Sequence, residues 1–212
     1  MSKRAILLLV IVAVAAGLGL WVSQQHFADT SPATASAPAV TSFTRLPEPR
    51  TLPAFSLQQS DGTPLTNDEL KGHWTVVFLG FTHCPDICPT TLVDMAETLK
   101  LLGEDAQRVQ AIFISVDPER DTPQQLATYT DFFDKRIIGL TGSPALIQAA
   151  ARNFKVRYEK VSKENQDPRN YAVDHSAGLY LLGPEGAFIK KFAYATPADS
   201  MASEIRQLLH TH

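Results

Sequence analysis

The amino-acid sequence predicts a mixed α/β fold in which helices cover a sheet. A continuous apolar run at residues 74–81 and a mostly apolar run at residues 109–117 are typical of buried strands. Each run is followed by a segment whose apolar residues recur at helical spacing, and a β-hairpin and one more helix come last. Strands that alternate with helices in this way indicate a sheet with helices packed against it.

The first 23 residues predict a membrane anchor. Lys3 and Arg4 precede an uncharged apolar run from Ala5 to Val22. At about 1.5 Å per residue a helix of this length covers most of a hydrocarbon core of roughly 30 Å, and the leading positive charges hold its start in the cytoplasm. A cleaved signal peptide is the alternative, but its apolar region is about 7 to 15 residues long. We therefore expect a single-pass protein of a bacterial inner membrane with its globular domain in the periplasm, since the Arg-rich, Ser-rich composition of a mitochondrial transit sequence is missing.

Residues 24–50 predict a flexible tether, because they are rich in Ala, Ser, Thr and Pro and have no apolar periodicity. The globular domain is then expected over residues 51–212. The chain has 212 residues and a net charge of -3, from 19 Lys and Arg against 22 Asp and Glu. This balance gives no basic excess of the kind that binding to nucleic acid requires.

The elements of the domain follow from local patterns. A hairpin is expected around Asp61-Gly62, with strands on either side. The run at 74–81 is the first buried strand, and a helix over 89–102 follows it, with Pro89 in its first turn and Gly103 at its end. The second buried strand leads to a helix over 122–133. Further elements are a short strand at 137–140, a helix at 143–154, an extended piece at 156–161, a hairpin at 177–194 and a last helix at 197–209.

This order is typical of a thioredoxin-like α/β sandwich with an N-terminal hairpin extension and an inserted helix. The only two cysteines, Cys84 and Cys88, lie where the first buried strand passes into its helix. In open α/β sheets the carboxyl end of a strand is where functional sites are built.

Two neighbouring cysteines could form a structural disulfide, a redox pair or part of a metal site. A disulfide across about five residues removes only about 2 kcal/mol of unfolded-state entropy, against nearly 5 kcal/mol for a loop of 100 residues, so a structural staple is poorly placed here. A helix N-terminus stabilises thiolate, which both attacks disulfides and binds metals. Pro89 disfavours helical geometry at Cys88, so we expect both cysteines on a loop just before the helix.

A metal site needs a third ligand, and His175 is the best placed of the six histidines. It precedes a hairpin strand that should run close to the cysteine loop, although a histidine simply packed at a strand edge is the alternative. Asp174 either orients the imidazole of His175 or caps a turn. We expect His83 to pack or to support another ligand, and the remaining histidines, His26, His73, His210 and His212, to be solvated.

Three segments, "GFTHCPDICPTTL", "SVDPERDTP" and "VDHSAGLYLLGPEG", resemble the signature segments of the Sco/SenC family. Members of that family are membrane-anchored copper proteins that serve assembly of the dinuclear copper centre of cytochrome c oxidase. The resemblance implies that Cys84, Cys88 and His175 bind copper, and that the partners are the copper-centre subunit of the oxidase and a copper donor. Two thiolates and one imidazole suit Cu(I), and the same set with a weak fourth ligand could hold Cu(II). Zinc competes, but a closed structural zinc site normally has four protein ligands.

The sequence therefore predicts a copper metallochaperone that breaks no substrate bond, and we expect the polar stretch 162–170 to be a mobile loop that brings in His175. A disulfide between Cys84 and Cys88 could not bind copper, which implies a thiol reductant as a further partner. The rival is an enzyme, a thiol-disulfide oxidoreductase that keeps the oxidase subunit's cysteines reduced. Against it, residues 173–176 lack the proline that thioredoxin-like reductases carry before the strand facing their thiols. A peroxidase is a third interpretation, but no peroxide pocket is defined.

Overall fold

The computed structural model describes residues 50–51, 55–162 and 171–211. The expected anchor, nearly all of the expected tether and most of the expected mobile loop lie outside the described residues. Among those that are described, no helix is both long and apolar enough to cross a membrane.

The domain is built on a six-stranded sheet in the order β1-β10-β9-β4-β5-β6. Strands β4 (Trp74–Gly80), β5 (Val109–Ser115) and β6 (Ile137–Leu140) are parallel, whereas β9 (Leu179–Leu182), β10 (Ala187–Phe192) and β1 (Arg50–Thr51) join antiparallel on the other side of β4. Every residue of β4 is buried, as its unbroken apolar run predicts. The expected thioredoxin-like α/β sandwich is confirmed.

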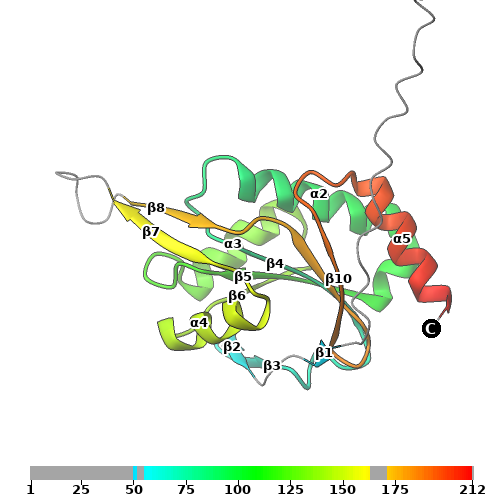
Figure 1. Ribbon diagram of the computed structural model, residues 1–212, viewed down its shortest axis with the longest axis horizontal. Coiled ribbons are helices and arrows are strands. Elements are labelled where there is room, and N and C mark those ends of the chain that lie inside the picture. Colours follow the sequence, from blue (N-terminus) through cyan, green and yellow to red (C-terminus); the bar gives the residue numbers. More distant parts are fainter. Residues whose placement is uncertain (1–49, 52–54, 163–170, 212) are drawn as a thin grey trace, which may run out of the picture. The chain divides into compact units, whose positions relative to one another are not determined.

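Helices and a hairpin cover the two faces of this sheet (Figure 1). One face carries α2 (Ile87–Leu102), α3 (Pro123–Phe133) and α5 (Ala198–Thr211). The other carries α4 (Pro144–Asn153) and the hairpin of β2 (Ser56–Gln58) and β3 (Pro64–Thr66). The N-terminal hairpin extension and the inserted helix are thus both present.

Local signals explain where the helices begin and end. Thr122 and Gln125 form a reciprocal capping box at the start of α3, and the Ser143 side chain accepts the Leu146 N–H at the start of α4. Gly103 ends α2 with a positive φ of 62°, a conformation that glycine adopts without strain. A short 3-10 helix, η1 (Gly103–Arg108), which the sequence did not predict, leads into β5.

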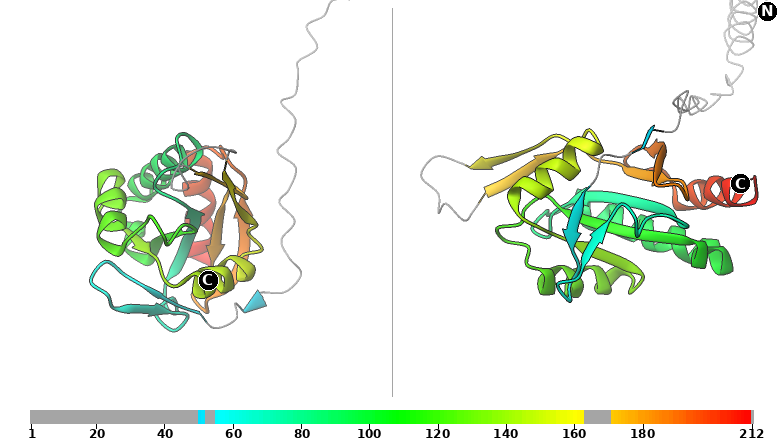
Figure 2. Two further views of the ribbon diagram at one scale, coloured as in Figure 1. Left: turned by 90° about the vertical axis from the view of Figure 1, so that its left-hand side faces the viewer. Right: turned by 90° about the horizontal axis from the view of Figure 1, so that it is seen from below.

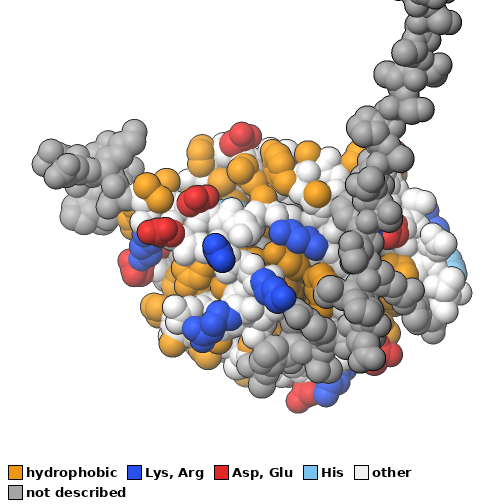
Figure 3. Space-filling model, in the orientation of Figure 1, with side chains coloured by type: hydrophobic (Ala, Val, Ile, Leu, Met, Phe, Trp, Pro, Cys, Tyr) orange, Lys and Arg blue, Asp and Glu red, His pale blue; other side chains and the backbone are white. Residues whose placement is uncertain are grey.

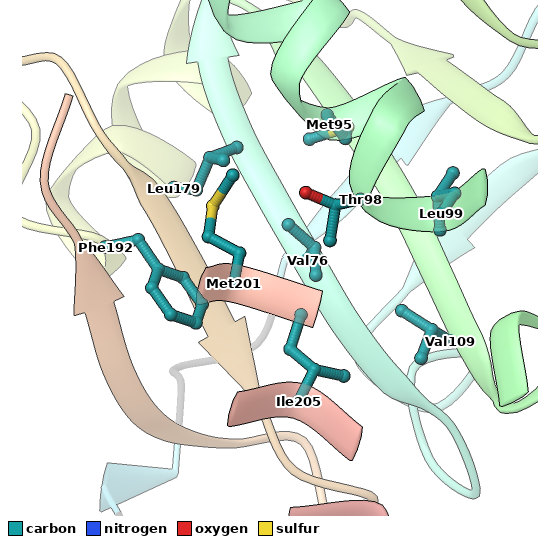
Figure 4. Close-up of a pocket in the computed structure, with 9 residues that line it drawn as sticks. All are labelled: Val76, Met95, Thr98, Leu99, Val109, Leu179, Phe192, Met201 and Ile205. Carbon is teal, nitrogen blue, oxygen red and sulfur yellow. The ribbon is translucent and has the colours of Figure 1, made fainter. Parts of the chain in front are cut away.

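The core between the sheet, α2 and α5 is almost completely filled. A cavity of about 10 Å³ remains there. Figure 4 shows its lining side chains, which are Val76, Met95, Thr98, Leu99, Val109, Leu179, Phe192, Met201 and Ile205. Its lining is apolar and it has room for one water at most, so it is a packing defect rather than a ligand site.

Two strands outside the main sheet form a separate ribbon. Strands β7 (Tyr158–Ser162) and β8 (Tyr171–His175) pair antiparallel, with Tyr158 opposite His175 and Ser162 opposite Tyr171. The ribbon runs from the body of the domain past the end of the sheet, as both Figure 1 and the right-hand view of Figure 2 show. The extended piece predicted at 156–161 corresponds to β7, but its pairing with β8 was not foreseen.

The expected start of the helix after the first buried strand was wrong by two residues. Helix α2 begins at Ile87, so Cys88 lies in its first turn and not on the loop before it. Proline lacks only the backbone N–H, and the first turn of a helix has no partner for that group within the helix, so Pro89 is tolerated there.

Candidate metal centre

The two cysteines lie at the carboxyl end of β4, one before α2 and one in its first turn. Both are free thiols, with Cys84 partly exposed and Cys88 buried. The backbone N–H of Cys88 donates to Sγ of Cys84 at 3.4 Å. The Cys84 sulfur thus accepts one of the N–H groups that the start of α2 leaves unpaired.

His175, at the end of β8, completes the cluster. Its Nε2 lies 3.3 Å from Sγ of Cys88, although 87 residues separate the two in the chain. Sγ of Cys84, Sγ of Cys88 and a ring nitrogen of His175 all lie within 4.8 Å of one another. The structure therefore brings together the three residues that the sequence singled out as candidate metal ligands.

Aromatic rings and a glycine shape the pocket of these ligands. The His175 ring makes an edge contact with Phe81 at 5.9 Å between centroids and a tilted contact with Phe78 at 6.1 Å. Gly80 allows the close approach of the Cys88 thiol, because a Cβ at that position would lie 2.8 Å from the sulfur. The walls formed by Phe78, Phe81 and Gly80 are thus apolar.

Burial sets the protonation states of two of the candidate ligands. It raises the pKa of the Cys88 thiol, a backbone hydrogen bond with Phe81 lowers it, and the negative charge of Cys84 raises it again. Burial lowers the pKa of His175 below its ordinary value, against the opposing effects of the Ser176 carbonyl and the Asp174 charge. Cys88 is consequently protonated and His175 neutral near pH 7 when no cation is bound, so a metal ion entering the site displaces the proton of Cys88.

The Ser176 carbonyl, rather than Asp174, lies beside the second ring nitrogen of His175. Nδ1 is 3.4 Å from that oxygen, which favours the tautomer that leaves the Nε2 lone pair directed at the thiols. The Asp174 side chain is exposed, and within the described residues no hydrogen bond joins it to the ring. His175 and Asp174 also border an open groove of about 580 Å³ between α4 and the β7–β8 ribbon.

His83, next to Cys84 in the chain, faces a different set of polar groups. Its Nδ1 lies 3.0 Å from Oγ1 of Thr82 and 3.7 Å from a carboxylate oxygen of Asp121. Its side chain is 52% exposed, so the structure shows it beside Thr82 and Asp121 at the surface. Of the other histidines, His73 is exposed and His210 lies 3.7 Å from Asp105, while His26 and His212 fall outside the described residues.

Asp121 fixes the cysteine loop to β5, a role that sequence reasoning missed. Its carboxylate, which is fully buried, accepts hydrogen bonds from the backbone N–H and the hydroxyl of Thr82 and from the hydroxyl of Ser115. The clue was the second aspartate of "SVDPERDTP", which was used only to recognise the family.

Asp117, in the same segment, is also buried. It accepts hydrogen bonds from Arg120 and from the hydroxyl of Tyr171, at the start of β8. The segment "SVDPERDTP" thus contacts both parts of the chain that carry candidate ligands. Asp121 contacts the cysteine loop through Thr82, and Asp117 contacts β8 through Tyr171.

Comparison with known proteins agrees with this geometry. The family model described as SCO1/SenC matches residues 44–210. The chain is 44% identical over 158 residues to "Protein SCO1 homolog 1, mitochondrial" of Arabidopsis thaliana, a match that covers 72% of this chain and 46% of that protein. The chain thus spans about half the length of this curated relative.

Solved structures of related proteins share the fold. Arabidopsis thaliana ScoI with copper bound has a TM-score of 0.70 and 40% identity, and the match covers 77% of this chain and 100% of that one. BsSco, described as a member of the Sco family of cytochrome c oxidase assembly proteins with a disulfide switch, has a TM-score of 0.61 and 27% identity over 79% of this chain and 99% of that one.

Proposed function

Because this chain belongs to the SCO1/SenC family, we propose that it is a copper metallochaperone for cytochrome c oxidase. It binds one copper ion through Cys84, Cys88 and His175 and delivers that ion to the dinuclear copper centre of the oxidase. The observation that carries the proposal is the convergence of three ligand atoms within 4.8 Å of one another from segments far apart in the chain. A copper-bound structure of a relative that is 40% identical supports the choice of metal.

The donor set favours copper over a closed structural zinc site. Two soft thiolates and one imidazole suit Cu(I), and with a water as fourth ligand they hold Cu(II). Structural zinc sites are almost always closed by four protein ligands, and the described residues bring only three together here.

Uptake and release follow from the different exposure of the two thiols. Copper arriving from a donor meets the partly exposed Cys84 first, while the buried Cys88 loses its proton as it binds. The neutral Nε2 of His175 then supplies the third bond. Release to the oxidase subunit proceeds by ligand exchange, in which ligands of the acceptor replace those of this chain one at a time, beginning at the partly exposed side.

The second candidate function, thiol-disulfide exchange, is favoured by the same pair of free thiols. The Cys84 thiolate attacks a disulfide of the oxidase subunit, and one sulfur of that disulfide leaves as a thiolate. Cys88, deprotonated as it reacts, then attacks Cys84, which releases the second substrate thiol and leaves a Cys84–Cys88 disulfide. Two electrons pass from this chain to the substrate, so a separate thiol reductant must restore the pair. The disulfide switch of BsSco supports a redox role of this kind.

One substitution separates the two functions. We expect His175→Ala in the reduced full-length chain to weaken copper binding at least tenfold and to abolish transfer to the purified copper-centre domain, while thiol exchange with a disulfide peptide continues. His83→Ala is the matched control, because His83 adjoins Cys84 but faces Thr82 and Asp121. Wild-type copper affinity in His175→Ala would refute the three-ligand site. Normal copper transfer with lost thiol exchange would also contradict the proposal.

The N-terminal segment adds a location to this function. We propose that residues 1–23 anchor the chain as a single helix in a bacterial inner membrane and that residues 24–50 tether the domain, 51–212, in the periplasm. The apolar run after Lys3 and Arg4 supports this proposal. Protease added to spheroplasts should digest the domain and leave a short membrane-bound fragment; protection of the domain would place it in the cytoplasm instead.

A further inference from the structure

His175 lies on the β7–β8 ribbon, which needs contacts with the rest of the domain to hold its position. The β7–β8 ribbon pairs with no strand of the main sheet among the described residues. A two-stranded ribbon alone is at best marginally stable in water. His175 lies at the end of β8 nearest the thiols, and Tyr171 lies at its other end, about 13 Å away at 3.3 Å per residue. The contacts of Tyr171 therefore influence the position of His175 through strand β8.

Tyr171 is held by a clamp, which we define as the side chains of Asp117, Arg120 and Tyr171; Asp117 is fully buried and the other two are partly buried. The Tyr171 hydroxyl donates to Oδ1 of Asp117 at 2.6 Å, and Nε of Arg120 donates to Oδ2 of the same carboxylate. The Arg120 guanidinium lies over the Tyr171 ring at 3.7 Å from its centroid and donates to the Tyr171 carbonyl oxygen at 3.0 Å. Each of the three side chains contacts both others, so the clamp is a closed triangle.

The clamp is anchored on rigid structure and reaches towards the metal site. Asp117 is fully buried just after β5, and its backbone N–H donates to the Ser115 hydroxyl at 3.0 Å. On the other side, the Arg120 guanidinium lies 5.9 Å from the Phe81 ring centroid. That ring makes the edge contact with His175, so packed groups connect the clamp to the candidate ligand by a path separate from β8 itself.

A second contact between the ribbon and the same loop is much weaker. Nζ of Lys160 lies 2.6 Å from Oε1 of Glu119, but these side chains are 38% and 61% exposed. Exposed ion pairs of this kind contribute little, whereas hydrogen bonds to a buried carboxylate are among the strong ones. Figure 3 shows acidic and basic side chains lying together on the surface near the ribbon, at the left of the view.

We propose that Asp117, Arg120 and Tyr171 are positioning residues that hold His175 within bonding distance of the Cys84 and Cys88 thiols. They touch no ligand atom and act through β8 and Phe81. This inference rests on the proposed copper function. It adds the residues that determine the fraction of time for which the His175 imidazole lies beside the thiols. Copper retention then depends on the clamp, because an imidazole that spends less time at the site lowers the apparent affinity in proportion.

The test is a double-mutant cycle between the clamp and the ligand. Tyr171→Phe removes one hydroxyl and keeps the ring under Arg120. We expect it to weaken copper binding about tenfold in a competition titration of the reduced full-length chain. In the His175→Ala background the same change should have no further effect, because the clamp acts only through that imidazole. Tyr158→Phe is the matched control: it makes the same change on β7, opposite His175, where no hydrogen bond of the hydroxyl is described, and copper affinity should stay within twofold.

Two further readouts keep the proposal falsifiable. In the copper-free protein, amide hydrogen exchange over residues 171–175 should be faster in Tyr171→Phe than in wild type and unchanged in Tyr158→Phe. Arg120→Lys, which keeps the charge but loses the planar stack and the paired hydrogen bonds, should weaken copper binding as Tyr171→Phe does.

The outcomes separate this inference from the proposed function. Unchanged copper affinity and unchanged hydrogen exchange in Tyr171→Phe would overturn the role of the clamp. If His175→Ala still weakened copper binding strongly in the same experiment, the proposed copper site would stand. Equal weakening by Tyr171→Phe with and without His175 would also overturn it, since the residue would then act on the thiols or on the whole fold. Wild-type affinity in His175→Ala would overturn the site, and the clamp's role with it.

Discussion

Gly80 provides the sharpest steric test of how the thiol pocket is built. A Cβ added to this residue, the last of β4, would lie 2.8 Å from Sγ of Cys88 and 3.0 Å from Cε2 of Phe113. Ordinary non-bonded contacts between such atoms are about 3.5 to 4.0 Å, so Gly80→Ala must displace the sulfur, the ring or the strand by about 1 Å. Neither neighbour is the free end of a flexible side chain, because both are buried in the core.

The magnitude follows from two opposing effects. Forcing an extra methyl group into a packed core costs about 1–3 kcal/mol. Replacing glycine by alanine where the backbone allows it recovers about 0.4–1 kcal/mol by restricting the unfolded chain. We therefore expect Gly80→Ala to lower the free energy of unfolding by about 0.5–2 kcal/mol. Copper affinity should fall at least tenfold, because ligands need to be held to within about 0.5 Å of their bonding positions.

The assay compares urea denaturation of the copper-free protein with copper competition titration of the reduced protein. Gly139→Ala, on β6, is the matched control, since its Cβ would lie 3.0 Å from Cβ of Leu126 in α3. It should be destabilised to a similar extent while copper affinity stays within about twofold. If Gly80→Ala kept wild-type stability and wild-type copper affinity, the close approach of β4 to Cys88 would be refuted. If both variants lost affinity equally, the loss would reflect stability alone.

Three further outcomes follow from buried groups near the site. Asp121→Asn should cost about 2–4 kcal/mol in urea denaturation, because an amide cannot accept all the hydrogen bonds from Thr82 and Ser115; a cost below about 0.5 kcal/mol would contradict the buried carboxylate. Tyr129→Phe should leave stability unchanged or raise it by up to about 1 kcal/mol, because the buried hydroxyl has no hydrogen-bond partner among the described residues; a large loss would mean that this hydroxyl is bonded in solution. Burial lowers the pKa of His175, so the folded copper-free protein takes up a proton there less readily than the unfolded chain does. The stability that this group contributes is therefore present above about pH 6.5 and is lost as the pH falls through the lowered pKa. Denaturation of wild type and His175→Ala between pH 7.5 and pH 5 should show the wild type losing more stability on acidification, and parallel curves would refute the shift.

The parts of the fold that depend on local pattern could be predicted from the sequence. The uninterrupted apolar run of β4 and the helical spacing that predicts α3 and α4 are signals that act over a few residues, and the structure confirms all three elements. The start of α2 was misplaced because the general effect of proline on the preceding residue was applied to Cys88. That effect is a preference and not a prohibition, and α2 begins before Pro89 because proline removes no needed N–H in the first turn of a helix.

Contacts distant in sequence explain the rest. Strand β8 alternates polar and apolar residues only weakly, and just one of its five residues is buried, so its pairing with β7 could not be recognised from periodicity. The role of Asp117 could not be recognised either, because its partner Tyr171 lies 54 residues further along the chain. His175, by contrast, could be singled out as a candidate ligand because motif order and the expected sheet both place it near the thiols.

X-ray absorption spectroscopy of the copper-loaded reduced protein tests the central claim most directly. With one equivalent of Cu(I) bound to the wild-type chain, we expect the copper shell to contain two sulfur atoms and one nitrogen atom. His175→Ala should lose the nitrogen and keep both sulfurs, whereas His83→Ala should keep all three. A wild-type shell without nitrogen, or a nitrogen that persists in His175→Ala, would contradict the convergence of Cys84, Cys88 and His175 on a single copper ion.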